Sequence, residues 1–228
     1  MGALKALVFD LDDTLFPEVS YIKSGFHAVA DWLDQAGVLP AQQAFEALWS
    51  AHAGGERGRL FDHLLAACPG ASEPPSVADL VRVYRSHAPG IAFYPGMAAL
   101  LDEAKARSLP IAVISDGFLE AQQQKAKALG LAQWANPILF TDTWGRAFWK
   151  PHTRAFAQVQ ETFQVEPDEI IYIGDNPSKD FQAPHALGWH SLQLVMPDQV
   201  HAERTGAAAR TRIHGIQALR AHLFAPVP

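Results

Sequence analysis

Acidic residues gather directly behind the first apolar run of the chain. Residues 7–16 read LVFDLDDTLF and contain Asp10, Asp12 and Asp13. Carboxylates this close repel one another and lose hydration at the end of a buried strand, so a cation or an anionic reaction is the expected reason for them. In an extended segment Asp10 and Asp12 project on the same face. Asp10 can then act as a nucleophile, while Asp12 protonates the leaving group and later activates water.

Further polar residues follow other apolar runs of the chain. The stretch VISDG supplies Ser115 and Asp116, and IYIGDNPSKD supplies Asp175 and Asp180. Lys150, in FWKPH, lies on the loop after a third run. Ligands of open α/β sheets bind beyond the carboxyl ends of the strands. We therefore expect all of these side chains to converge on one edge of a sheet.

The residue types in this group favour magnesium and phosphate. Carboxylate oxygens of Asp10 and Asp175 suit Mg²⁺, which prefers oxygen ligands. No spacing of cysteine or histidine is typical of a zinc site. Ser115 would donate a hydrogen bond to a phosphoryl oxygen, and Lys150 would screen the charge between phosphate and nucleophile. The pattern therefore predicts phosphoryl transfer assisted by Mg²⁺.

Short apolar runs alternate with helical patterns over most of the chain, which indicates a parallel sheet with crossover helices. The expected strands are 6–9, 111–114, 138–141, 170–173 and 191–195. The expected helices are 97–107, 119–129, 153–163, a short one capped by Ser178, and 216–223. We predict an α/β fold with a Rossmann-like parallel sheet and helices on both of its faces.

One long stretch interrupts this alternation. Residues 17–91 contain several helical patterns and no convincing strand. Such a stretch is too long for a structureless connection, so a helical insertion is the better interpretation. We predict a Rossmann-like catalytic core formed by residues 1–16 and 92–228, and a small all-helical cap domain formed by residues 17–91.

Residues of the insertion and its start are weaker candidates for the site. Arg57 and Arg59 flank a glycine-containing loop that could grip an acidic substrate, although surface arginines are common. Glu18, Tyr21 and Lys23 follow the first motif, where the core and the cap should meet. Each of these residues has an ordinary structural interpretation beside the functional one.

Composition excludes several classes of protein. The 228 residues are 49% hydrophobic and 18% charged, as in ordinary globular proteins, and the net charge of −6 with no basic block argues against nucleic acid. The single cysteine, Cys68, excludes an internal disulfide and is interpreted as a residue of the cap core. No apolar run approaches the ~20 residues of a membrane span. We expect a cytoplasmic protein without a membrane segment, and the sequence does not indicate its oligomeric state.

These motifs, in this order, resemble the haloacid dehalogenase superfamily, and its phosphatase branch in particular. They are DLDDT at residues 10–14, then Ser115, then Lys150, then GDNPSKD at residues 174–180. The resemblance implies that Asp10 is the nucleophile and a metal ligand. It implies that Asp12 is the acid and base and lends its main-chain carbonyl to Mg²⁺.

The same resemblance assigns the remaining residues of the site. Asp175 completes the metal site, and Ser115 and Lys150 hold the phosphoryl group with help from the backbone of Asp116. Asp180 supports Lys150 or the waters on the metal. The helical insertion after the first motif corresponds to the cap of one large subgroup.

The family includes several activities, so alternatives stay open. A Mg²⁺-dependent phosphatase would act on a small phosphorylated metabolite, such as a sugar phosphate, a phosphoglycolate-like acid or a nucleotide monophosphate. A phosphomutase of the family would use the same phosphoaspartate. A hypothesis from another class of protein is a non-catalytic phospho-switch module, like the receiver domains of signalling proteins, which would keep its aspartyl phosphate for a partner to recognise. Dehalogenation of haloacids is disfavoured by Asp12, because the dehalogenases of this fold lack an acid at that position.

Overall fold

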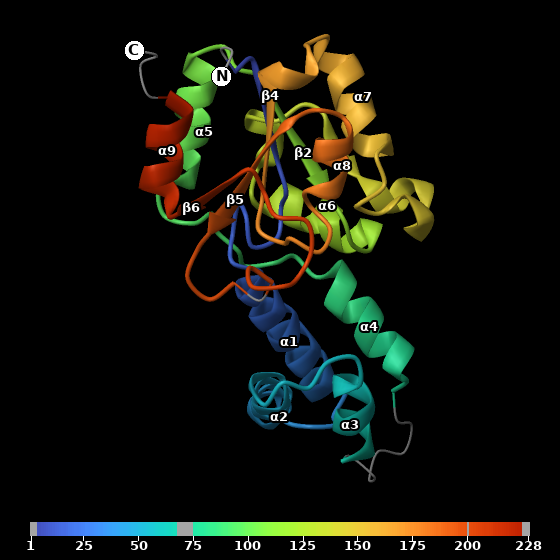
Figure 1. Ribbon diagram of the computed structural model, residues 1–228. Coiled ribbons are helices and arrows are strands. Elements are labelled where there is room, and N and C mark those ends of the chain that lie inside the picture. Colours follow the sequence, from blue (N-terminus) through green and yellow to red (C-terminus); the bar gives the residue numbers. More distant parts are fainter. Residues whose placement is uncertain (1–3, 68–74, 200, 225–228) are drawn as a thin grey trace. The chain divides into compact units, whose positions relative to one another are not determined.

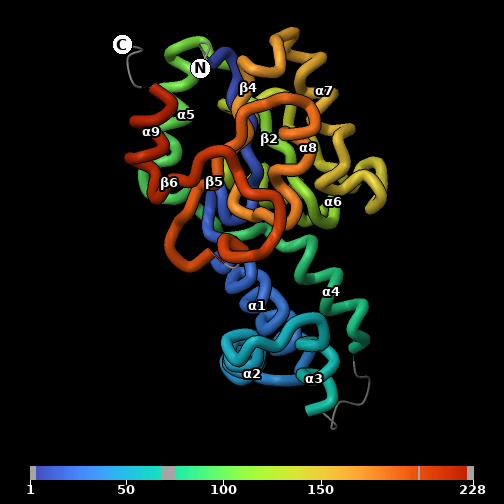
Figure 2. The backbone as a smooth tube through the Cα atoms, in the orientation of Figure 1, coloured from blue at the N-terminus to red at the C-terminus, as the bar shows by residue number. Residues whose placement is uncertain are grey.

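The computed structural model describes residues 4–67, 75–199 and 201–224. The chain divides into two compact units, one comprising Met1–Val19 with Ile91–Pro228 and the other Ser20–Gly90 (Figures 1 and 2). These divisions fall beside the predicted boundaries, and the role of the second unit as a cap stays a prediction. The prediction for Cys68 lies outside the described residues.

The first unit contains a six-stranded parallel sheet in the order β3-β2-β1-β4-β5-β6. Val8 of the central strand lies opposite Ala112 on one side and Tyr172 on the other. The α/β fold with a parallel sheet is thereby confirmed, with one further strand, β6, that we did not predict. The strands are β1 Ala6–Phe9, β2 Ile111–Ser115, β3 Ile138–Phe140, β4 Ile170–Gly174, β5 His190–Val195 and β6 Thr211–His214.

Helices cover both faces of this sheet. One face packs Ala6, Val8 and Tyr172 against Phe156 of α7 (Arg154–Phe163) and against Trp189, all of them buried. The short helix α8 (Gln182–Ala186) lies on the same side. Figure 1 shows α5 and α9 together on the other side of the sheet. The bounds of the other α-helices of this unit are α5 Met97–Ala106, α6 Leu119–Ala128 and α9 Ile216–Phe224.

The turn after β4 corrects one sequence-based expectation. Ser178 does not cap the next helix, because α8 begins only at Gln182 and the Ser178 hydroxyl donates to Asn176 Oδ1 at 2.7 Å. The described residues of the unit also form four short 3-10 helices, namely η1 Leu131–Gln133, η2 Thr141–Trp144, η3 Arg146–Phe148 and η4 Pro167–Glu169. Among the helices of the described ranges, none has the length and apolar character that crossing a membrane requires.

The second unit is built on helices around its own apolar core. Phe26, Val29 and Leu33 of α1 pack there with Leu48 and Leu80, and all five are buried. Side chains buried at this spacing form one stripe of an amphipathic helix. Its elements are α1 Glu18–Gln35, whose first two residues belong to the other unit, α2 Ala41–Ala53, α3 Leu60–Ala66 and α4 Val77–Ser86.

Candidate active site

Three of the predicted site residues lie where strands of the sheet end. Asp10 directly follows β1, Ser115 is the last residue of β2, and Asp175 directly follows β4. Because β1 pairs in parallel with both β2 and β4, these three ends meet at the same edge. Each of the three residues is at most 1% exposed, so the two carboxylates need partners other than bulk water.

Lys150 supplies a buried cation at this edge. Its ammonium donates to Asp10 Oδ1, to Asp180 Oδ1 at 2.8 Å and to the Tyr172 hydroxyl at 3.0 Å. Burial disfavours the charged form of Lys150, but the neighbouring carboxylates prevail and raise its pKa. The lysine therefore stays charged and brings Asp10 and Asp180 together.

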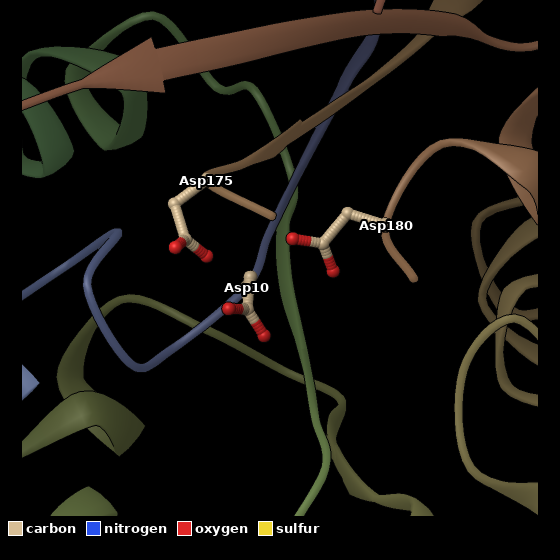
Figure 3. A group of neighbouring side chains, drawn as sticks. All are labelled: Asp10, Asp175 and Asp180. Atoms are coloured by element: carbon tan, nitrogen blue, oxygen red, sulfur yellow. The ribbon is translucent and has the colours of Figure 1, made fainter. Parts of the chain in front are cut away.

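Asp10, Asp175 and Asp180 form a group that could hold a metal ion. One oxygen from each carboxylate lies within 4.8 Å of the others, and Figure 3 shows the three side chains grouped together. Within the described part of the chain, Asp10 Oδ2 and Asp175 Oδ2 are buried and accept no hydrogen bond. Buried oxygens without a donor, on two hard carboxylates, fit a cation such as Mg²⁺.

The third carboxylate of this group already has its partners. Asp180 Oδ1 accepts from Lys150, and Asp180 Oδ2 accepts from the main-chain N–H of Asn176 at 2.9 Å. Burial would raise the pKa of Asp180, but Lys150 outweighs it and the pKa is lowered. Asp10 and Asp175 are thus the better candidates for direct metal ligands, and Asp180 supports the lysine.

Burial and mutual repulsion raise the pKa values of Asp175 and Asp10. Burial, together with the charges of Asp180 and Asp10, raises the pKa of Asp175 to about 9. Burial also raises the pKa of Asp10 to about 6, against the opposing effect of Lys150. Like charges held together in a dry place disfavour ionisation, and a bound cation would reverse that effect.

Asp12 lies beside two residues of α6 that the sequence analysis missed. Lys125 Nζ lies 2.6 Å from Asp12 Oδ1, and Gln122 Nε2 donates to Asp12 Oδ2 at 2.6 Å. Gln122 Nε2 also donates to Ser115 Oγ at 2.8 Å. Burial would raise the pKa of Asp12, yet the ion pair with Lys125 prevails and lowers it. A three-residue spacing on a helix was the one available signal that Gln122 and Lys125 share a face.

Asp116 contributes its carboxylate, whereas the sequence analysis considered only its backbone. Both carboxylate oxygens accept from the main-chain N–H of Lys150, at 3.0 and 3.1 Å. The Thr141 hydroxyl donates to Asp116 Oδ1 at 2.7 Å. Asp116 therefore ties the loop that carries the lysine to the end of β2.

Two glutamines, Gln193 within β5 and Gln199 after it, hold the backbone of the first and last motifs. Gln193 Nε2 donates to the main-chain carbonyl of Asp175 at 3.0 Å, and Gln199 Nε2 donates to that of Asp13 at 2.5 Å. Neither glutamine was a candidate, because an amide that bonds backbone carbonyls has no sequence signature. These bonds hold the two acidic turns to the end of one strand.

Glu18 and His201 lie together near Asp12. Their side chains approach to 3.7 Å, and the Glu18 main-chain N–H donates to Asp13 Oδ1 at 2.8 Å. Burial and the charge of Asp12 raise the pKa of Glu18 to about 7. Burial, followed by Arg204, lowers the pKa of His201 to about 4, so the histidine is neutral at physiological pH.

The weaker candidates of the second unit make local contacts. Arg57 donates to the carbonyls of His52 and Glu56, each at 2.7 Å, and so caps the end of α2. The Tyr21 hydroxyl donates to a carbonyl of α4 at 3.2 Å. Lys23 Nζ lies 5.8 Å from the centre of the Trp49 ring. Arg59 directly precedes α3. A role of these residues in substrate binding stays a prediction.

Comparison with known proteins identifies a family and several relatives. A model of the haloacid dehalogenase-like hydrolase family matches residues 4–188. The glyceraldehyde 3-phosphate phosphatase of Methanocaldococcus jannaschii is 26% identical over 198 residues, which cover 84% of this chain and 85% of that protein. The phosphoserine phosphatase of Thermus thermophilus is 28% identical over 222 residues, which cover 81% of this chain and 86% of that protein.

Solved structures show the same fold. The HAD hydrolase YfnB of Bacillus subtilis, solved with bound magnesium, superposes with a TM-score of 0.69 at 18% identity. The superposition covers 96% of this chain and 98% of YfnB. At this identity the likeness concerns the fold alone.

Proposed function

This chain belongs to the haloacid dehalogenase-like hydrolase family, and we propose that it is a Mg²⁺-dependent phosphatase of small phosphorylated metabolites. The observation that carries the proposal is the buried contact of Lys150 with Asp10, beside two carboxylate oxygens that have no donor in the described residues. A phosphate dianion can approach an aspartate only where cations offset the repulsion between them. Lys150 is one such cation, and a metal ion on the two donor-free oxygens would be another. Two phosphatases among the relatives support the same reaction class.

In the first step, Asp10 attacks phosphorus and the bond from phosphorus to the leaving oxygen breaks. Asp12, which must first take up a proton because Lys125 favours its ionised form, gives that proton to the leaving oxygen, and Asp10 becomes an aspartyl phosphate. In the second step, Asp12 takes a proton from water, whose oxygen attacks phosphorus and releases phosphate from Asp10. Both aspartates return to their starting forms, with one water consumed for each ester cleaved.

The remaining residues hold the phosphoryl group and the charge. Lys150 neutralises part of the phosphate charge, and Ser115 with the backbone of Asp116 donates hydrogen bonds to its oxygens. Mg²⁺, held by Asp10, Asp175 and the main-chain carbonyl of Asp12, would neutralise the rest of that charge when bound. The magnesium in the structure of YfnB supports this choice of ion.

The substrates we expect are sugar phosphates, phosphoglycolate-like acids and nucleotide monophosphates, in a cytoplasmic setting. In this proposal residues 17–91 act as a cap over the leaving group. The relatives that act on glyceraldehyde 3-phosphate and on phosphoserine support a substrate of this size.

Turnover of 4-nitrophenyl phosphate tests the proposal. We expect phosphate release by the wild-type chain with Mg²⁺, no release with EDTA, and loss of at least about a hundredfold in Asp10→Asn, since this change removes the nucleophile and a metal ligand together. Asp168→Asn, an exposed aspartate of the same unit, is the matched control and should keep full activity. Full activity of Asp10→Asn with EDTA present would overturn the proposal.

Product analysis separates the phosphatase from its alternatives. Free phosphate from each metabolite of a screen, read by ³¹P NMR, indicates hydrolysis, whereas an isomerised phosphate ester indicates a mutase. An aspartyl phosphate that survives for many minutes indicates a phospho-switch.

A further inference from the structure

Two side chains on one face of α6 engage both oxygens of Asp12. Lys125 Nζ lies 2.6 Å from Oδ1, and Gln122 Nε2 lies 2.6 Å from Oδ2. Gln122 and Lys125 are 2% and 5% exposed. Two buried donors on adjacent turns, meeting a carboxylate more than a hundred residues away, fix both the position and the plane of that carboxylate.

The surroundings of the two donors strengthen this arrangement. Lys125 Nζ also lies 5.9 Å from the centre of the Phe16 ring, which belongs to the same acidic turn as Asp12. Gln122 Nε2 reaches Ser115 Oγ at 2.8 Å as well as the main-chain carbonyl of Asp116. One amide therefore connects the proton-transfer residue with the phosphate-binding end of β2.

The backbone beside α6 is shaped to allow this contact. Gly117 adopts φ +125°, and a Cβ there would meet the Gln122 amide at 3.0 Å. A side chain at residue 117 would strain the backbone and crowd the glutamine. The glycine that follows Ser115 and Asp116 thus lets Gln122 approach.

We propose that Lys125 and Gln122 are positioning residues for the proton transfers of Asp12, holding its carboxyl group in line with the phosphoryl group bound at Ser115. The inference rests on the proposed phosphatase function. It gives α6 a part in protonating the leaving group. Lys125 and Gln122 play this part through Asp12 and not through contact with the substrate. Loss of Lys125 should therefore mimic partial loss of Asp12 and leave the phosphate-binding residues in place, whereas loss of Gln122 also removes a donor to Ser115 Oγ.

Dependence on the leaving group distinguishes positioning from a merely structural role. A 4-nitrophenolate leaves without a proton, whereas a phenolate gains more from one. We expect Lys125→Met to lower kcat/KM for phenyl phosphate by about tenfold more than for 4-nitrophenyl phosphate, a part of the ~10²–10⁴-fold contribution of general acid catalysis. Lys125→Arg should restore much of the loss, and Asp12→Asn should show the same selectivity more strongly.

Matched controls are available on the same helix. Lys127→Met and Gln123→Leu replace exposed residues of α6 and should leave both substrates unaffected. If Lys125→Met does not fold, Gln122→Leu carries the same comparison, because it removes a donor without removing a charge. The double variant Asp12→Asn/Lys125→Met should lose no more selectivity than Asp12→Asn alone.

The outcomes separate this inference from the proposed function. Equal losses for phenyl and 4-nitrophenyl phosphate in the Lys125 and Gln122 variants would overturn the inference while wild-type turnover and its dependence on Asp10 persist. A wild-type chain that turns over neither ester, or an Asp10→Asn variant that keeps its activity, would overturn the proposed function itself.

Discussion

Asp180 Oδ1 accepts a hydrogen bond from the Lys150 ammonium at 2.8 Å, and neither side chain is exposed to solvent. The same lysine contacts Asp10, and the other oxygen of Asp180 accepts from the Asn176 main-chain N–H. Asp180 thus links the turn behind β4 to the lysine that faces Asp10. A buried ion pair of this kind is stable only while each charge keeps its partners.

Lys150→Met should therefore reduce both stability and turnover. Removing one partner of a buried pair leaves uncompensated carboxylates, at a cost of about 3–5 kcal/mol in the free energy of unfolding. Urea unfolding measures this change, and release of phosphate from 4-nitrophenyl phosphate measures turnover. Lys127→Met is the control for loss of an exposed lysine. Unchanged unfolding of Lys150→Met would contradict the central role of its ammonium.

Gly174→Ala should disturb the same centre by adding a single methyl group. A Cβ at residue 174 would lie 2.7 Å from Asp180 Oδ2 and 2.9 Å from its Cγ, distances that real Cβ atoms do not tolerate. Asp180 would have to move from Lys150, so we expect lower thermal stability and a loss of turnover. In Gly90→Ala the nearest atom is 3.8 Å away, and this control should behave like the wild type. Equal behaviour of the two variants would refute the close packing of Gly174 on Asp180.

The sheet was largely predictable because its strands are continuous apolar runs. β1, β2 and β4 are buried along their whole length, and such runs bounded by polar turns have few other interpretations. β6 was missed for the converse reason. It reads Thr-Arg-Ile-His at the edge of the sheet, where its side chains are only half-buried or exposed, so it carries little apolar signal.

The candidate site was predictable only where residues follow strands. Asp10, Ser115 and Asp175 are placed by strand ends, which the apolar runs reveal. Gln122 and Lys125 lie on a helix, and polar residues of a helix ordinarily face solvent. Their burial depends on a contact with a segment more than a hundred residues away, which no local pattern encodes.

Asp116→Ala should weaken the loop that carries the lysine. The variant leaves the main-chain N–H of Lys150 without its carboxylate acceptor and the Thr141 hydroxyl without its partner. An unsatisfied buried donor costs about 1–3 kcal/mol, and the displaced loop should also lower kcat. Asp116→Asn keeps an acceptor oxygen and should retain more of both. Urea unfolding measures the stability of the two variants, and steady-state kinetics measure their kcat. If Asp116→Asn were no more stable and no more active than Asp116→Ala, the hydrogen-bonding role of Asp116 would be contradicted.

Stabilisation by Mg²⁺ should increase with pH. Without metal, Asp175 has a pKa of about 9 in the folded chain against an ordinary value of 3.8, so folding binds a proton. Stability without Mg²⁺ should therefore fall as pH rises through this window. Mg²⁺ needs the ionised carboxylate and must displace that proton, so its affinity should rise by up to about tenfold per pH unit below pH 9.

Thermal unfolding with and without Mg²⁺ measures this linkage. The rise in Tm caused by a fixed Mg²⁺ concentration should be larger at about pH 8.5 than at about pH 6, because more of the carboxyl is then ionised. Asp175→Asn removes both the ligand and the titration, so its Tm should respond little to Mg²⁺ at either pH. A wild-type response that is the same at both values would show that the cation does not compete with protons at Asp175.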